Sequence, residues 1–341
     1  MFHKLFSLVI TFFIVLVSLL HGQTMPVPAA DHHIHIRSEA GSEAFVKIMK
    51  ELEGRDIGNL PPLPPDEIVQ ALDKAGIDNG VVLSSAYFFG IPDLDFENEY
   101  ERVMAENDHA MDAAANYPDR LKAFISVNPL KDYAVKEIKR CESKQNMAGL
   151  KLHLANSDLD LRNPVHVDSL RLILKEASHL DMPVIIHLFT RNPDYGRQDA
   201  SIFIEQVLAE VPDLIVQIAH MGGAGLYTPN TDSVMMAFEQ AVTEYPAVMD
   251  EDLVFDIAAS ARNPEIALSQ GDTARAEALR QSNKMLADDI KQIGVQRVVF
   301  GTDWVGFSRA PADFTKTVRS IPLSDMMIQK LFANRSPYLG D

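Results

Sequence analysis

Eight nearly continuous apolar segments alternate with helical segments along this 341-residue chain, and this alternation constrains its fold more than any other feature. An apolar segment without polar alternation is typical of a strand buried on both faces, as in a parallel sheet. Eight such strands alternating with helices predict a closed (β/α)8 TIM barrel. The predicted strands cover about residues 29–36, 81–85, 121–127, 148–154, 183–188, 214–223, 254–258 and 297–304.

One domain is expected over residues 29–341, because a barrel with insertions accounts for the whole of this length. Hydrophobic residues make up 47% of the chain and charged residues 23%, a composition that allows a large buried core. Between the strands, the apolar periodicity predicts helices, including one near residues 42–52 and one long helix over about 264–293.

Residues 1–22 are predicted to be a signal peptide that is not part of the barrel. Lys4 precedes a 16-residue apolar run, Leu5–Leu20, and polar residues follow the run. A helix of this length measures about 24 Å, which is short for a hydrocarbon core of about 30 Å. We therefore expect a cleaved signal, a periplasmic or secreted protein, and no stable membrane anchor after cleavage.

Charge and cysteine content exclude several classes of partner. The formal net charge of -17 argues against binding to nucleic acid or to anionic lipid. The single cysteine, Cys141, excludes an internal disulfide and a metal cluster held only by thiolates. A small-molecule substrate is the expected partner, and the sequence leaves open whether the protein is a homo-oligomer.

The first predicted strand carries three histidines, His32, His33 and His35. If the strand alternates strictly, Asp31, His33 and His35 share one face and His32 takes the other. Two imidazoles on one face are able to hold a metal ion. Taken alone, the pair is equally consistent with histidines packed in a core.

Further candidate ligands stand at the ends of later predicted strands. His187 ends the fifth strand, His220 the sixth and Asp303 the eighth. The carboxyl ends of the strands form the active-site face of such barrels, and burying these groups without partners would cost several kcal/mol. Imidazole nitrogens together with a carboxylate oxygen suit Zn²⁺, and Mn²⁺ or Fe²⁺ accept the same ligand types.

These motifs in combination resemble the amidohydrolase superfamily. Within it, they are similar to the amidohydrolase-related branch, which includes aminocarboxymuconate semialdehyde decarboxylase and pyrone dicarboxylate lactonase. The resemblance extends from about residue 29 to residues 334–337. It rests on Asp-x-His-x-His at 31–35, on His187, on Ala-His-Met-Gly-Gly at 219–223 and on Phe-Gly-Thr-Asp-Trp at 300–304.

The resemblance implies a site with one divalent metal ion, Zn²⁺ being the first candidate. The implied ligands are His33, His35, His187 and Asp303. A water activated at the metal would attack the substrate, and Asp303 would accept its proton and pass it to the leaving group. The resemblance places His220 beside the metal as a polarising or proton-shuttling residue.

Two cationic residues are candidates for substrate binding. Lys151, on the fourth strand, either meets a substrate carboxylate or pairs with a barrel carboxylate such as Asp256. In binuclear members of the superfamily a carboxylated lysine on this strand bridges two metals, so a binuclear site with His220 as a further ligand is the alternative. Arg191 lies on the loop after the fifth strand, where an arginine either clamps an anionic substrate or is simply solvated.

The sequence therefore predicts a metal-dependent hydrolase that acts on a small amide, ester or lactone, with carboxylated substrates included. Two alternatives remain open. The first is a non-oxidative, metal-dependent decarboxylase, which differs in releasing CO₂. The second is a non-catalytic binding protein that uses the barrel as a scaffold.

Overall fold

The computed structural model describes residues 26–144, 147–250, 252–308 and 310–340. The predicted signal peptide, 1–22, lies outside the described residues. Eight parallel strands form one sheet in the order β1 to β8. Their bounds are β1 Ala30–Ile36, β2 Asn79–Ser84, β3 Leu121–Ser126, β4 Met147–His153, β5 Val184–His187, β6 Val216–Ile218, β7 Leu253–Asp256 and β8 Val298–Val299.

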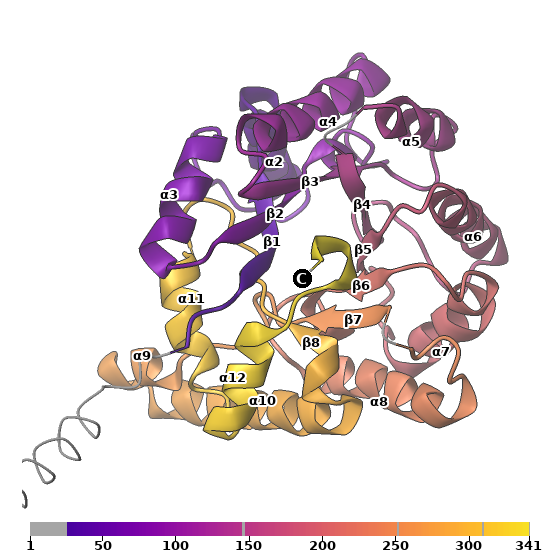
Figure 1. Cartoon of the computed structure of the whole chain (residues 1–341). Coiled ribbons are helices and arrows are strands. Elements are labelled where there is room, and N and C mark those ends of the chain that lie inside the picture. The colour runs from indigo at the N-terminus through magenta and orange to yellow at the C-terminus, as the bar shows by residue number, and fades with distance from the viewer. Residues whose placement is uncertain (1–25, 145–146, 251, 309, 341) are drawn as a thin grey trace, which may run out of the picture.

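Hydrogen bonds between β1 and the segment around β8 close this sheet into a barrel. The backbone N–H of His32 donates to the carbonyl of Phe300 at 3.0 Å, and that of His35 donates to the carbonyl of Trp304 at 2.9 Å. Closure removes the free edges that an open sheet would expose. The predicted (β/α)8 barrel is confirmed, with the strands forming the inner ring in Figure 1.

Helices surround the ring of strands on its outside (Figure 1). Among the described residues, no helix is long and apolar enough to cross a membrane. The helices are α2 Glu39–Glu51, α3 Pro65–Ala75, α4 Glu99–Asn116, α5 Ala134–Glu142, α6 Pro164–His179, α7 Arg197–Gln206, α8 Pro229–Glu244, α9 Pro264–Ser269, α10 Thr273–Ile293, α11 Pro311–Val318 and α12 Asp325–Ala333.

The long helix predicted over 264–293 is in fact two helices, α9 and α10. Between them Gly271 adopts a left-handed conformation with φ 79°. The side chain of Asp272 then accepts a hydrogen bond from the backbone N–H of Arg275 at 2.9 Å. A left-handed glycine followed by an N-cap aspartate ends one helix and starts the next, so the prediction of one continuous helix was wrong.

The strands β6 and β8 are shorter than the apolar segments predict. His220 and Asp303, which follow these strands, adopt φ values of 57° and 56°. This left-handed conformation is uncommon for residues other than glycine, and it takes the chain out of the extended form. The apolar segments are therefore longer than the strands because their last residues form the rim of the barrel.

The C-terminal segment closes the amino end of the barrel. Figure 1 shows the C-terminus at the centre of the ring of strands. There Tyr338 and Leu339 pack against inward-facing side chains of the strands, including Val81, Phe124 and Ile185. The amino end is thus filled, and the cavity described below lies at the opposite end.

A buried carboxyl group on α10 makes the stability of this fold depend on pH. Asp289 is 3% exposed and accepts a hydrogen bond from the hydroxyl of Tyr227. The pKa of Asp289 is raised to about 7, chiefly by burial. The charges of Asp232 and Glu239 contribute to this rise, and the hydrogen bond from Tyr227 acts against it. The folded chain therefore binds the proton of Asp289 more tightly than the unfolded chain, where the pKa is near 3.8.

We expect the substitution Asp289→Asn to stabilise the protein at pH 8. The tighter proton binding of the folded state makes the free energy of unfolding fall as the pH rises from about 4 to about 7. Asparagine carries no titrating proton and avoids this loss. The free energy of unfolding of the variant, measured with urea at pH 8, should therefore exceed that of wild type by about 1–3 kcal/mol. Asp288→Asn, at the partly exposed neighbouring position that pairs with Lys284 and Lys291, is the control and should give no gain. Equal stability of Asp289→Asn and wild type at pH 8 would contradict the prediction.

Candidate active site and metal centre

A cavity of about 560 Å³ lies at the carboxyl ends of the strands. The site residues predicted from the sequence line it with one exception, Arg191. The predicted residues in the lining are His33, His35, Lys151, His187, His220 and Asp303. Arg37, Arg55, Tyr87 and His153 also line it, although the sequence analysis did not select them as site residues.

Three of the four predicted metal ligands come together at the bottom of this cavity. His33, His35 and Asp303 each bring a donor atom within 4.8 Å of the others. Oδ1 of Asp303 lies 3.1 Å from Nε2 of His35 and 3.7 Å from Nε2 of His33. Donors that each lie about 2.1 Å from one ion are separated by roughly 3.0–3.5 Å, so this spacing fits a shared divalent metal.

The orientation of His33 leaves a nitrogen available for such a metal. Its Nδ1 lies 3.0 Å from Oδ2 of Asp256, an arrangement that places the ring proton on Nδ1. Its Nε2 is buried and has no hydrogen-bond partner within the described part of the chain. A buried nitrogen lone pair without a partner is unfavourable unless something else binds it. The arrangement therefore fits a ligand nitrogen facing a metal.

The protonation states of the group also suit metal binding. Burial lowers the pKa of His33 to about 3, and burial likewise lowers the pKa of His35. For Asp303, burial acts to raise the pKa, but the hydrogen bond with His35 and nearby histidine charges hold it below its usual value. Near neutral pH the group therefore consists of neutral imidazoles and an ionised carboxylate, the forms that bind metal.

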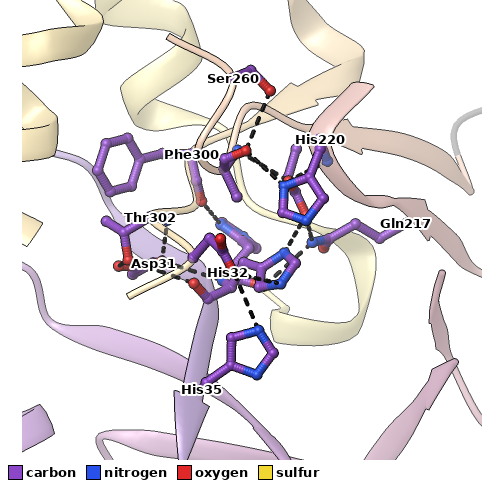
Figure 2. Close-up of polar contacts among 12 residues, drawn as sticks. Asp31, His32, His35, Gln217, His220, Ser260, Phe300 and Thr302 are labelled. Atoms are coloured by element: carbon purple, nitrogen blue, oxygen red, sulfur yellow. Dashed lines mark hydrogen bonds and ion pairs between the residues drawn. The ribbon is translucent and has the colours of Figure 1, made fainter. Parts of the chain in front are cut away.

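His220 is held beside this group by two hydrogen bonds, one from its backbone and one from its ring. Its N–H donates to Oδ1 of Asp256 at 2.8 Å, and its Nδ1 lies 2.7 Å from the carbonyl oxygen of Ala258. Figure 2 shows the ring of His220 within this network. Because Nδ1 donates to the carbonyl, the other nitrogen, Nε2, is the one able to act on a substrate.

The fourth predicted ligand, His187, lies apart from the closest donor group. Its ring stacks on the ring of His153 with 3.9 Å between centroids and lies 4.9 Å from the ring of His220. Among the described residues, the donor groups within 4.8 Å do not include it. His187 lines the same cavity, and its role as a ligand stays a prediction.

Lys151 is a buried cation at the wall of the cavity. It is 1% exposed, and its Nζ has no hydrogen-bond partner within the described ranges. Burial lowers its pKa to about 8, although the charges of Asp256 and Asp303 act to raise it. The hydrogen-bonded pair with Asp256 that the sequence left open does not form. A buried ammonium in this state favours an anionic partner from outside the chain.

Arginine is present in the cavity, but from a different segment than predicted. The guanidinium of Arg191 lies outside the lining and pairs with Asp93 at 2.9 Å. Arg37 and Arg55 line the cavity instead. Arg37 is buried and donates to the carbonyl of Val305 at 2.9 Å. It continues the spacing of two set by His33 and His35 and lies directly after β1, a signal in the sequence that could have identified it.

Comparison with known proteins agrees with this geometry. A sequence profile described as Amidohydrolase matches residues 30–333. The chain belongs to the amidohydrolase family. A search of curated protein sequences gave no match.

Solved structures share the fold of this amidohydrolase-family protein at low sequence identity. One is 5-carboxyvanillate decarboxylase from Novosphingobium aromaticivorans with bound manganese, at a TM-score of 0.59 and 14% identity over 92% of this chain and 97% of that chain. A second is 5-carboxyvanillate decarboxylase from Sphingomonas paucimobilis, at a TM-score of 0.59 and 15% identity over 90% of this chain and 96% of that chain. A third is a probable 2-pyrone-4,6-dicarboxylic acid hydrolase from Acinetobacter baumannii with bound citric acid. Its TM-score is 0.50, and its sequence is 16% identical over 89% of this chain and 99% of that chain.

The family assignment confirms the predicted superfamily and is compatible with both predicted reaction types, hydrolysis and decarboxylation. One expectation, that strict alternation along β1 puts Asp31 on the same face as His33 and His35, was wrong. Asp31 does not line the cavity, because the pairing of β1 with β2 shifts by one residue between Asp31 and Ile34. This β-bulge breaks the strict alternation, and the carboxylate of Asp31 instead accepts hydrogen bonds from Thr302, as Figure 2 shows.

The metal content of two histidine variants tests the arrangement. We expect His220→Asn to keep the same amount of metal per chain as wild type, because His220 does not belong to the group formed by His33, His35 and Asp303. We expect His35→Asn to lose most of the metal, because it removes one donor of that group. Elemental analysis of the purified proteins measures both. If His220→Asn halves the metal content, the binuclear alternative replaces the mononuclear site.

Proposed function

We propose that this amidohydrolase-family protein is an exported, metal-dependent hydrolase of a small carboxylated amide, ester or lactone. The observation that carries the proposal is the position of the donor group. His33, His35 and Asp303 open onto a cavity that also holds the buried ammonium of Lys151. Export rests on the signal-peptide pattern of residues 1–22 alone.

A divalent ion bound by His33, His35 and Asp303, with His187 proposed as the fourth ligand, would polarise a substrate carbonyl and lower the pKa of water. Zn²⁺ suits these ligands, and the manganese bound by the Novosphingobium decarboxylase favours testing Mn²⁺ beside it.

Asp303 and His220 carry the proton transfers in this proposal. The carboxylate of Asp303 is ionised at neutral pH, so it accepts a proton from the attacking water and returns it to the leaving group. The ring of His220 is fixed through Nδ1 by the carbonyl of Ala258. Its Nε2 is therefore the atom that faces the substrate, and it stabilises negative charge developing on an oxygen when the ring carries both protons.

The charges of the cavity favour a substrate with a carboxylate. Lys151, Arg37 and Arg55 contribute three cations to the lining, whereas Asp303 is the one acidic residue among the described lining residues. This local excess of positive charge contrasts with the net charge of -17 for the whole chain. Apolar side chains, including Phe45 and Phe88, line the remainder and suit an apolar substrate body.

Non-oxidative decarboxylation is the second candidate function. The same cations would hold a carboxylate that is lost as CO₂, and two of the similar solved structures are 5-carboxyvanillate decarboxylases. The third alternative, a non-catalytic binding protein, accounts for the cations but gives no role to three converging metal donors.

Product analysis separates the two reactions. Purified protein loaded with Zn²⁺ or with Mn²⁺ is incubated with carboxylated lactones, amides and aromatic acids. Hydrolysis releases an acid or an amine with uptake of water, whereas decarboxylation releases CO₂ and consumes a proton. We expect hydrolysis products; release of CO₂ alone would select the decarboxylase.

The substitution Asp303→Asn should abolish turnover while the protein stays folded. It removes both a metal donor and the proposed base, so we expect kcat to fall by at least about 10³-fold. Circular dichroism and thermal unfolding check that the barrel remains intact. Activity close to wild type would place the chemistry elsewhere.

The substitution Lys151→Met should weaken binding of carboxylated substrates. Loss of a charge-assisted hydrogen bond predicts an increase in KM of about 10- to 100-fold. The methyl ester of the same substrate should show little change, since it carries no charge. Arg191→Met is the matched control and should leave KM nearly unchanged, because Arg191 pairs with Asp93 outside the cavity. A larger effect of Arg191→Met than of Lys151→Met would overturn the assignment.

A further inference from the structure

A continuous series of hydrogen bonds, buried beyond its first partner Tyr338, connects the C-terminal segment with the proposed metal-binding group. The hydroxyl of Tyr338 donates to Oε1 of Gln217 at 2.6 Å. Nε2 of Gln217 donates to Oδ2 of Asp256 at 2.7 Å, and the same oxygen lies 3.0 Å from Nδ1 of His33. Figure 2 shows Gln217 beside the histidine cluster. The amino end of the barrel is thus linked to its carboxyl end through polar atoms.

The orientation of the Gln217 amide follows from its neighbours. Besides Asp256, the carbonyl oxygen of His32 lies 3.2 Å from Nε2, so both groups on that side are acceptors. The NH₂ group has to face them, and the amide oxygen then requires a donor on the opposite side. The hydroxyl of Tyr338 supplies it, and burial keeps this hydroxyl protonated by raising its pKa well above the usual value.

Other contacts hold the C-terminal segment independently of this hydroxyl. The backbone N–H of Ser336 donates to Nε2 of His32 at 3.1 Å, and the side chain of Asn334 donates to the carbonyl of Val298 at 2.7 Å. The ring of Tyr338 packs edge to face on Phe124 with 5.0 Å between centroids. Removal of the hydroxyl alone therefore leaves the segment in place.

We propose that the C-terminal segment 334–338 is a positioning element for the metal centre, with Tyr338 acting through Gln217 and Asp256 on the imidazole of His33. The inference rests on the proposed function in so far as His33 binds a metal. Tyr338 fixes the amide, the amide fixes Oδ2 of Asp256, and that oxygen holds the Nδ1 proton and the plane of the His33 ring. Nε2 is thereby kept directed at the metal.

Without the hydroxyl, Oε1 of Gln217 is a buried acceptor that has lost this donor. Rotation of the amide then lets Oε1 accept a hydrogen bond from another donor, and the same rotation removes the hydrogen bond from Nε2 to Asp256. A carboxylate with one donor fewer holds the His33 ring less firmly. The consequence is weaker metal binding at a distance from the substituted residue.

The metal affinity of Tyr338→Phe tests the proposal. Affinity for Zn²⁺ or Mn²⁺ is measured by competition with a chelator, and Co²⁺ replaces them where an absorption spectrum is needed. Direct partners of metal ligands contribute about 10- to 100-fold in affinity, so we expect a loss of about 3- to 10-fold for this more distant residue. The Co²⁺ spectrum should change because the His33 ring is less firmly oriented. Gln217→Met, which leaves the C-terminal segment intact, should show an equal or larger loss.

Leu339→Ala is the matched control. Leu339 packs in the same cluster as Tyr338, and no hydrogen bond connects its side chain to Gln217. This variant should lower the melting temperature of the metal-free protein and leave metal affinity unchanged. Tyr338→Phe keeps the packing and removes the hydrogen bond, so it should lower metal affinity, which Leu339→Ala does not.

A double-mutant cycle separates positioning from general destabilisation. If Tyr338 acts through Asp256, Tyr338→Phe should have no further effect on metal affinity in an Asp256→Asn background. Additive effects, or an unchanged affinity in the single variant, would overturn the inference and leave the proposed function standing. Failure of wild type to bind any of the three metals would overturn the proposed function and this inference with it.

Discussion

The carboxylate of Asp256 is the group on which the rest of the site depends. Its Oδ2 binds Nδ1 of His33 and the amide of Gln217, and its Oδ1 accepts the backbone N–H groups of His220 and Ala258. Burial acts to raise the pKa of Asp256, but its interaction with His33 and the hydrogen bond from the backbone of His220 hold it below its usual value. One permanent negative charge at the end of β7 thus orients groups from β1 and β6 at once.

Much of the fold was predictable from the sequence because a strand buried on both faces has a simple signature. The eight apolar segments correspond to the eight strands in order. The signature gives no information on where the hydrogen bonds between strands stop. It therefore overestimated the length of β8, which ends at Val299. It also cannot show a one-residue shift in pairing, which is why Asp31 was placed on the wrong face. The helix break at Asp272 did carry a capping signal, and apolar periodicity alone concealed it.

The candidate site was predictable where its residues follow the ends of strands, as His220 and Asp303 do, because the fold brings all strand ends to one rim. Residues on loops follow no such rule. Arg55 enters the cavity from an irregular segment, whereas Arg191, on a loop closer in sequence to a predicted ligand, turns to Asp93. Gln217 lies within a strand and is recognisable as part of the site only once the barrel places it next to Asp256.

The closure of the barrel has a consequence for how the protein matures. β1 supplies two of the proposed metal donors, His33 and His35, while Asp303 and the backbone that pairs with β1 come from residues 300–304. A chain whose synthesis stops before these residues lacks both a donor and the strand that completes the ring. Such a fragment has the histidines of β1 but neither the carboxylate of Asp303 nor a closed ring, so the proposed metal site forms only in chains that extend through residue 304.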